Sequence, residues 1–576
     1  MFNFLDTKKN SPVMKLFSVG LLIGLTSPFQ LWAKDLPPNE INSRFGSYLA
    51  GRQAQFDSNS RFAIHYYLSA LKKSPNNIIL LRRLVALLIS EGRVEEAIPI
   101  AKQLVRISND ISNSSNLLIG LAEAKNQKFE NAFENISRLS NTGLNSYLSP
   151  MLKAWLLVGQ NKIKEALRIV DQNTKIKGLE LLYGIQGALI SEFGGNFEDA
   201  IKRYQIISKS NENANLRITI LLGNLYERLG NKEKAREIYE KYKKEQPTTT
   251  MLDDAYLRLE TGKKPEPNNR TVLGGISKAL FSLGFAIQKQ NRYQAILFSR
   301  LAIYLKPSFT IAKLLIAESL DENNKLKDAN IVYYSISKDP NYSWAARLKI
   351  AHNLDRLGQT DEAIRKLQAM SLEKKERVDS LVKMGNILQR HKRYQASINA
   401  YEQAKNRIQN NYDKFWSLYF SLGISYERID KWPMAEKNLL LALKYRPNHP
   451  SILNYLGYSW VEKGLQLDRA QEMIEKAVKL RPRDGYIIDS LGWALYRSGN
   501  IEGAVKHLER AVLIRPEDPT INDHLGDIYW AIGRKNEATF QWNRALILNP
   551  EKDQIPKIKR KLKLGLPKGN DKSKGI

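Results

Sequence analysis

The sequence predicts an all-α protein, a superhelical solenoid of about 14 stacked antiparallel helix pairs. Three observations predict this class. A Leu-Gly pair returns near the end of the chain, with glycines at Gly457, Gly492 and Gly526, in steps of 35 and 34 residues. An Ala, a bulky residue, a second Ala and a Pro follow each pair in the same order. A period of this size indicates one helical hairpin per repeat, which buries its apolar face only against its neighbours.

Positions equivalent to the glycine recur back along the chain, most of them 34 or 35 residues apart. They are Gly51, Val85, Gly120, Ala154, Ala188, Gly223, Leu283, Ala317, Ala351, Gly385 and Gly423. An Ala follows twelve residues later, as at Ala235, and a bulky residue four positions after that, as at Tyr239. Small residues let two antiparallel helices approach closely, and the bulky side chain one turn further on fills the remaining space. Asn, Asp and Gly supply the turns, and a Pro ends the second helix.

The regular spacing fails between Gly223 and Leu283, which are 60 residues apart. We expect a lone helix over residues 253–260 and then a loop, because Pro and Asn are dense from Gly262 to Asn269. The loop is interpreted as a kink or hinge between two blocks of repeats. The expected divisions are a signal peptide at 1–33, an N-terminal block at 39–260, the loop or hinge at 261–271, a C-terminal block at 272–550, and a basic cap and tail at 551–576, with a capping helix over 556–564.

The repeat pattern resembles the tetratricopeptide repeat (TPR) family. The resemblance is strongest in the last three units, which begin at Leu456, Leu491 and Leu525, and it extends over residues 40–550. The last unit carries a nearly full family signature: Leu525, Gly526, Tyr529, Ala538, Trp542, Ala545 and Pro550. Together with the N-terminal pattern described below, the chain resembles exported TPR proteins of Gram-negative bacterial envelopes.

The resemblance also implies a ligand-binding surface, because the first helix of each unit lines the concave face in this family. Carried over to the last three units, the family's ligand positions are Asn454, Tyr458, Tyr486, Asp489, Trp493, Tyr496, Arg497, Asp523, Asp527 and Trp530. Spacings of three and four residues place several of them on one helix face. An aromatic and acidic surface favours basic or polar ligands, and the family's basic clamp for a C-terminal carboxylate is not evident. The alternative is that some of these aromatic residues pack between units.

The N-terminal residues 1–33 have the pattern of an export signal. Lys8, Lys9 and Lys15 precede a short apolar run over 16–25, and a candidate cleavage site follows Ala33. Translation from Met14 instead of Met1 would give a compact signal. The pattern predicts a periplasmic or otherwise exported protein, and it is compatible with association of that protein with a membrane. The alternative is an uncleaved membrane anchor or a disordered leader.

The composition of the chain favours some classes of partner and excludes several kinds of catalytic and metal site. Lys and Arg number 89 and Asp and Glu 59, so the net charge is +30, which favours anionic partners such as acidic lipid or glycan. Alternatively, the positive charge serves only to keep a long solenoid with Lys-rich helix surfaces soluble. The absence of cysteine excludes disulfides, thiol catalysis and Cys-based metal sites. The six histidines are scattered, and no phosphate-binding or nucleophile motif occurs. We therefore expect no catalytic residues, no metal and no cofactor.

The sequence thus predicts a non-enzymatic scaffold of the bacterial cell envelope that binds a protein or peptide on its concave TPR surface. The alternative is a basic adaptor that binds anionic envelope glycan or lipid, with the basic tail as its contact. Export would argue against nucleic acid as a partner. The identity of the partner and the oligomeric state are left open.

Overall fold

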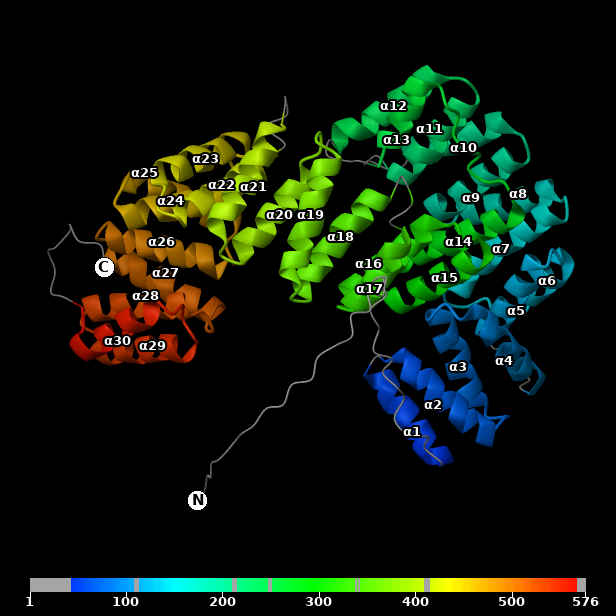
Figure 1. Cartoon of the computed structure of the whole chain (residues 1–576), viewed down its shortest axis with the longest axis horizontal. Helices are drawn as coiled ribbons and strands as arrows, with labels where there is room; N and C mark the ends of the chain where they lie inside the picture. The colour runs from blue at the N-terminus through cyan, green and yellow to red at the C-terminus, as the bar shows by residue number, and fades with distance from the viewer. Residues whose placement is uncertain are drawn as a thin grey trace, which may run out of the picture. The chain divides into compact units, whose positions relative to one another are not determined.

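The computed structural model describes residues 43–57, 59–107, 113–209, 215–246, 251–336, 339, 342–408 and 415–566, and within them it is built from helices, with no strand (Figure 1). The predicted signal peptide, 1–33, and the end of the predicted tail, 567–576, lie outside these residues. The chain forms two compact units, Met1–Leu87 and Leu88–Ile576, which divide within α3.

The first compact unit contains a helix pair whose packing follows the repeat pattern. Its helices are α1 (Arg44–Phe56), α2 (Ser60–Lys73) and the start of α3 (Ile78–Ser90). Tyr67 is fully buried between α1 and α2, against Gly51, where a Cβ would overlap the tyrosine ring. The Tyr67 hydroxyl donates a hydrogen bond to Gln55 Oε1 at 2.9 Å. The small residue and the large residue therefore meet as the spacing predicts.

The second compact unit continues the same alternation of helices. Its first block holds α4 (Val94–Ile107), α5 (Asn113–Lys125), α6 (Phe129–Ser137), α7 (Asn145–Gly159), α8 (Ile163–Thr174), α9 (Glu180–Phe193), α10 (Phe197–Lys209), α11 (Leu216–Arg228), α12 (Lys232–Glu245) and α13 (Asp253–Thr261). Each odd-numbered helix from α5 to α11 packs against the next helix in sequence, which makes an antiparallel pair. The helix expected over 253–260 is α13, which stands alone after α12.

The remaining helices form eight further pairs and a final single helix. They are α14 (Val272–Ile287), α15 (Arg292–Leu305), α16 (Thr310–Glu322), α17 (Leu326–Ile336), α18 (Ser343–Arg356), α19 (Thr360–Glu373), α20 (Asp379–Arg390), α21 (Tyr394–Asn406), α22 (Trp416–Glu427), α23 (Trp432–Tyr445), α24 (Pro450–Lys463), α25 (Leu467–Leu480), α26 (Gly485–Arg497), α27 (Ile501–Ile514), α28 (Pro519–Ala531), α29 (Lys535–Ile547) and α30 (Gln554–Leu564). Each even-numbered helix from α14 to α28 packs against its successor. The predicted all-α superhelical repeat fold is confirmed.

The repeat residues explain how each pair closes. The repeat alanines Ala235, Ala504 and Ala538 are fully buried, and a Cβ at Gly526 would overlap the indole of Trp542. Several turns between the paired helices use a glycine in the left-handed region, such as Gly230 with φ 84°. Glycine reaches this backbone region at little steric cost, whereas a side chain would be strained there. Local sequence thus sets both the close approach of the helices and the turn that joins them.

The loop after α13 is packed against the first block of the second unit. Asn268 and Asn269 are buried. The Asn268 amide donates hydrogen bonds to Glu192 on α9, at 2.9 Å, and to the Leu221 carbonyl on α11, at 2.8 Å. The loop between α13 and α14 covers residues 262–271, one residue shorter than the predicted 261–271, and buried contacts hold it in place. Its role as a hinge, and the division of the chain into two TPR blocks there, stay predictions.

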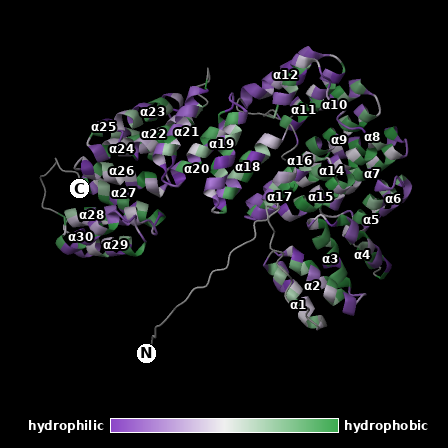
Figure 2. Cartoon of the chain, in the orientation of Figure 1, coloured by the Kyte–Doolittle hydropathy of each residue, from purple (hydrophilic) through white to green (hydrophobic). Residues whose placement is uncertain are grey.

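Helix α14 returns to the first block and lies along α7 and α9 (Figure 1). The contact is close, because a Cβ at Gly275 would overlap the ring of Trp155 on α7. The Trp155 indole donates to Gln186 Oε1 at 2.9 Å, and the Gln186 amide donates to Ser282 Oγ on α14 at 3.1 Å. Figure 2 colours the α14 region largely green and α12 largely purple, as expected for a helix covered by other helices and one left on the surface.

The C-terminal helix α30 covers the last repeat. Ile558 is buried against the core of the final units, as expected for a helix that caps an exposed apolar end. The predicted capping helix over 556–564 is therefore present, beginning two residues earlier, at Gln554. Within the described residues, no helix has both the length and the apolar character that a membrane span needs.

Candidate ligand-binding surface

The ten residues predicted to bind a ligand lie on three successive first helices, α24, α26 and α28. Each of these helices packs against the next, so their side chains form one continuous surface, here called the first-helix surface. Asn454 and Tyr458 come from α24, and residues Tyr486, Asp489, Trp493, Tyr496 and Arg497 come from α26. Asp523, Asp527 and Trp530 come from α28. Regular helices hold all ten residues, so their relative positions are set by the stacking of units.

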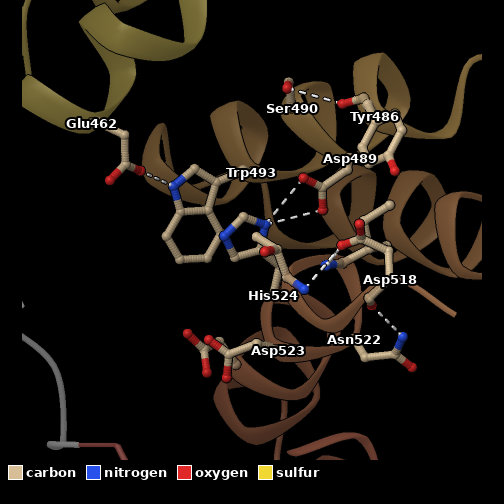
Figure 3. A network of polar contacts seen from close by, with 12 residues as sticks. Glu462, Tyr486, Asp489, Ser490, Trp493, Asp518, Asn522, Asp523 and His524 are labelled. Atoms are coloured by element: carbon tan, nitrogen blue, oxygen red, sulfur yellow. Dashed lines mark hydrogen bonds and ion pairs between the residues drawn. The ribbon is translucent and has the colours of Figure 1, made fainter. Parts of the chain in front are cut away.

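A polar and aromatic network crosses this surface (Figure 3). Trp493 stacks on His524, with ring centroids 4.2 Å apart and planes 15° from parallel. The Trp493 indole N–H donates to a Glu462 carboxylate oxygen on α24. His524 Nδ1 lies 3.0 Å from Asp489 Oδ1. The network therefore ties together the first helices of three consecutive units.

The Asp489–His524 pair is buried. Asp489 is 6% exposed and His524 8% exposed, so the charge and hydrogen bond of Asp489 act on the imidazole in an environment of low polarity. Burial by itself lowers the pKa of His524, but Asp489, with smaller contributions from Asp523 and Asp527, raises it to about 9. At neutral pH the imidazole is protonated, and both ring nitrogens are donors. Asp489 is thus committed to an internal ion pair and is not free to bind a ligand.

Asp523 and Asp527 hold a lysine from the last helix. Lys561 Nζ on α30 lies 2.8 Å from Asp523 Oδ2 and 2.7 Å from Asp527 Oδ2. The lysine side chain is 12% exposed, and the two carboxylates are 13% and 8% exposed. Asp527 also accepts a hydrogen bond from the Trp542 indole at 2.8 Å. Burial raises the pKa of Asp527 to about 6, against the opposing effect of the Lys561 charge.

The aromatic residues of the surface differ in what surrounds them. Trp530 packs against Trp542, with ring centroids 5.4 Å apart, and lies so close to Gly565 that a Cβ there would overlap its ring. Trp493 and Tyr496 are half-buried side by side, with ring centroids 5.3 Å apart. Tyr486 is 50% exposed. Trp530 therefore serves the junction with the C-terminal segment, while the aromatic residues of α26 keep surface open to solvent.

Tyr458, Asn454 and Arg497 complete the set. Burial raises the pKa of the half-buried Tyr458, so its hydroxyl stays protonated and can donate. Asn454 Oδ1 is enclosed and accepts no hydrogen bond from any described residue, and the same is true of Asp523 Oδ1. Arg497 is exposed. The surface thus presents acceptors and aromatic edges, and its role in binding a ligand stays a prediction.

Three residues that matter here were not among the predicted ten. They are His524, which the sequence presents only as one of six scattered histidines, Glu462 and Lys561. Lys561 was assigned to a basic tail, although its charge is buried between two aspartates. One signal in the sequence points to the first of them, since Asp489 and His524 are 35 residues apart, one repeat length. Lys561 and Asp527 are also one repeat length apart, at 34 residues, but α30 lies outside the repeat pattern, so this spacing did not mark Lys561.

The part of the chain that the structure describes contains no cluster of three or more His, Cys, Asp or Glu side chains arranged to hold a metal ion. The first-helix surface combines the ion pairs of Asp489 with His524 and of Lys561 with two aspartates with partly exposed aromatic side chains.

Two segments of the chain match known repeat families. The family model described as TPR repeat matches residues 492–533, and the model described as tetratricopeptide repeat matches residues 193–248. The chain therefore contains tetratricopeptide repeats in both of these segments. Proteins with TPR repeats generally act as protein-interaction scaffolds, and the repeat fold is typically non-catalytic. The segment 492–533 includes the end of α26 and all of α28, and it holds six of the ten predicted residues.

Individual relatives share shorter or more distant similarity. A TPR repeat-containing protein of Pseudomonas aeruginosa is 28% identical over 167 residues, which make up 28% of this chain and 27% of that protein. The match therefore spans about a quarter of the relative's length. Among solved structures, the APC/C hetero-tetramer Cut9–Hcn1 is 14% identical, with a TM-score of 0.38 over 91% of this chain and 97% of that one. YrrB, a TPR protein with an unusual peptide-binding site, is 17% identical, with a TM-score of 0.27 over 34% of this chain and 97% of that one.

Proposed function

We propose that this TPR protein is a non-catalytic scaffold of the bacterial cell envelope that binds protein segments carrying Lys or Arg on its first-helix surface. The fold supplies a rigid series of first helices, and the surface residues supply acceptors and aromatic area. These are the elements that a surface needs to recognise a cationic peptide side chain with an aliphatic stem.

The position of Lys561 is the observation that carries this proposal. Its ammonium group is held by two carboxylates at 2.7 and 2.8 Å on the same helix, α28, that bears the predicted ligand positions. A lysine therefore fits this surface, with its charge neutralised and nearly enclosed. One unit earlier, the positions that correspond to Asp523 and Asp527 are Asp489, which already pairs with His524, and Trp493, so a partner lysine there would contact aromatic surface instead of a pair of carboxylates.

Two enclosed acceptors support the same ligand chemistry. Asn454 Oδ1 and Asp523 Oδ1 receive no hydrogen bond from the described residues. A buried acceptor left without a donor costs about 1–3 kcal/mol, so a ligand that brings N–H groups gains when it supplies them. Lys and Arg bring only donors, which matches this need better than an acidic ligand would.

The envelope location rests on the N-terminal pattern alone. Lys8, Lys9 and Lys15 before the apolar run 16–25 favour export, and residues 1–33 lie outside the described part of the chain. Sequencing the N-terminus of the mature protein from an osmotic-shock fraction tests this part. A mature chain that starts near Lys34 supports export, whereas an intact Met1 or Met14 in the cytosolic fraction contradicts it.

Binding is tested with three synthetic helical peptides of equal length, one rich in Lys, one in Glu and one in Gln, titrated into the full chain. We expect the Lys peptide to bind most tightly. The substitution Tyr486→Ser removes exposed aromatic contact area. It should lower the affinity for the Lys peptide about tenfold, since aromatic anchors often contribute about 1–2 kcal/mol or more. Phe540→Ser, at an exposed position on the second helix α29, is the matched control and should not change affinity.

Equal affinity for all three peptides would contradict recognition of basic segments. Equal losses in the Tyr486→Ser and Phe540→Ser variants would contradict the choice of surface. Asp489→Asn is not a suitable probe, because Asp489 holds the buried His524 and its replacement perturbs the fold as well as the surface.

A second candidate function is favoured by the outer side of α30. Lys557, Lys559, Arg560 and Lys563 are exposed there, while Lys561 faces inward. With a net charge of +30, this side would attract anionic glycan or lipid. Binding to vesicles that contain acidic lipid, compared at low and moderate salt, tests it. Charge reversal at Lys559 and Arg560 should abolish salt-sensitive binding, and no effect would contradict this role.

A further inference from the structure

Two cations lie together where α14 packs onto the first block, and neither forms an ion pair with a described residue. Arg217 lies in the first turn of α11, and Lys278 lies on α14. Lys278 is 9% exposed, although lysine is almost never buried without a partner. Burying an unpaired charge costs free energy of folding, so two such cations at one place need a physical explanation.

The geometry brings the two cations to one place. Arg217 donates from its guanidinium to Ser282 Oγ at 2.9 Å and lies over the ring of Phe281 at 5.3 Å. Ser282 is four residues after Lys278 on α14, and its hydroxyl donates to the Lys278 carbonyl at 2.6 Å. Residues four apart on a helix share a face, so Lys278 and the serine that Arg217 contacts face the same side.

The polar groups around them are mostly donors. The Gln186 amide also donates to Ser282 Oγ, at 3.1 Å, so this oxygen already receives two hydrogen bonds. The nearby carboxylate is Glu192, whose oxygens are taken up by Arg228 and by the side chain and backbone N–H of Asn268. Lys306, at the end of α15, adds a third positive charge to the surroundings of Lys278. The described residues here supply positive charge and N–H groups in excess of acceptors.

We propose that an oxyanion, the phosphate or carboxylate group of a ligand, binds between Arg217 and Lys278 at the junction of α11 and α14. An oxyanion brings negative charge and several acceptor lone pairs to a place that lacks both, and a guanidinium and an ammonium together are suited to hold it. The site does not depend on the first-helix surface of the last units, and it involves helices that are not consecutive in the repeat array.

The electrostatic state of the two side chains is consistent with this site. Burial, together with the charges of Lys306 and Arg217, lowers the pKa of Lys278 to about 7. Burial also lowers the pKa of Arg217, to about 10, and no carboxylate offsets it. A bound anion would reverse both effects, because a nearby negative charge favours the protonated forms.

The site is tested by isothermal titration of the full chain with inorganic phosphate at constant ionic strength, with sodium chloride as the blank. We expect one saturable site per chain. Lys278→Met removes the ammonium while keeping the aliphatic stem, and Arg217→Gln removes the guanidinium charge. Each substitution should lower the affinity for phosphate at least about tenfold, since a hydrogen bond to a charged group contributes roughly 1.5–3 kcal/mol. Lys263→Met, at an exposed lysine in the loop after α13, is the matched control and should bind phosphate normally.

A second titration separates the two sources of the anion. A short neutral peptide with a free C-terminal carboxylate is compared with the same peptide amidated at its C-terminus. Tighter binding of the free carboxylate than of phosphate, lost in Lys278→Met, identifies a carboxylate ligand, and the reverse order identifies a phosphate ligand. The proposal is overturned if neither probe shows saturable binding to the native chain.

The proposal is also overturned if Lys278→Met keeps the affinity for both probes, because surface charge then explains the binding. A purely structural lysine makes a different prediction, namely that Lys278→Met is more stable than the native chain and anions do not affect either protein. Circular dichroism shows whether each variant keeps its helices. Arg217→Lys, which retains the charge, keeps the test decisive if Arg217→Gln does not fold.

Discussion

Individual side chains of the first-helix surface have two separate tasks. Asp489 pairs with His524, and Lys561 pairs with both Asp523 and Asp527, so these side chains hold neighbouring helices together. Tyr486 and Arg497 remain exposed. Residues predicted as one ligand set thus divide into a supporting layer and an accessible layer. A supporting layer of this kind fixes the rotamers of the groups above it, as the stacking of Trp493 on His524 illustrates.

The Asp489–His524 pair predicts how stability depends on pH. The folded-state pKa of His524 is about 9, above the value of about 6.5 in an unfolded chain. The contribution to stability is therefore fully present below pH 6.5 and is lost as pH rises through 9. It amounts to at most about 3 kcal/mol, at 1.36 kcal/mol per pKa unit. Asp527 acts at lower pH. Its folded-state pKa of about 6 lies above the unfolded value of about 4, so the free energy of unfolding decreases as pH rises from about 4 to 6.

Urea unfolding between pH 6 and 10 measures this effect. The native chain should lose stability across the window relative to His524→Gln, which keeps a hydrogen-bonding group but has no charge to lose. The control His65→Gln, at an exposed histidine in the first compact unit, should follow the native pH dependence. Parallel curves for the native chain and His524→Gln would show that the imidazole is not charged in the folded protein.

The repeat pattern of the sequence predicts the helices, but it does not predict that α14 packs against α7 and α9. Its periodicity identifies a first helix of a repeat, and the structure agrees. Its second role, packing along α7 and α9, depends on Trp155, Gln186 and Gly275, which come from different repeats. A repeat pattern describes contacts between neighbours in sequence, so it contains no information on a helix that returns to an earlier block. The low polarity of α14 was the available signal, since a helix that is apolar nearly all round is covered on several sides.

Gly275→Ala should weaken this contact, because the new Cβ meets the Trp155 ring and one of the helices must shift. Overpacking of this kind costs typically about 1–3 kcal/mol. Hydrogen exchange of α7 and α14 should become faster, with little change in the last units. Ser277→Ala, two residues further along the same helix, is the control, since the Ser277 hydroxyl bonds its own helix at Leu273. Unchanged exchange in α14 of Gly275→Ala would contradict the close packing described here.

The whole molecule is an array of small units, and this organisation has a thermodynamic consequence. Each pair buries its apolar face mainly against its neighbours, so stability is a sum of unit and interface contributions. The unit around α14 has additional contacts with α7 and α9, whereas the final unit is held by α30 alone at its outer side. Different parts of the array therefore have different stabilities.

Unfolding of the full chain should accordingly take place in more than one step. Hydrogen exchange measured by mass spectrometry across a urea series should give a lower midpoint for peptides of α28 and α29 than for peptides of α7, α9 and α14. Lys561→Met leaves Asp523 and Asp527 without their cation and should lower the midpoint of the last unit further, since breaking a buried pair costs about 3–5 kcal/mol. Lys559→Met, at an exposed lysine of the same helix, is the control. A single midpoint for all helices would contradict independent units.

The fold class, the repeat length, the turns and the identity of the first helices all followed from the sequence, because they depend on residues within about 35 positions of each other. The predicted ligand residues do lie on one surface, for the same reason. The tertiary structure was needed to show that Lys561 enters that surface, that His524 pairs with Asp489, and that α14 brings Lys278 to Arg217. A separation of one repeat length, as between Asp489 and His524, does not by itself show that two side chains pair, because the pairing depends on which charges the packed helices bury together.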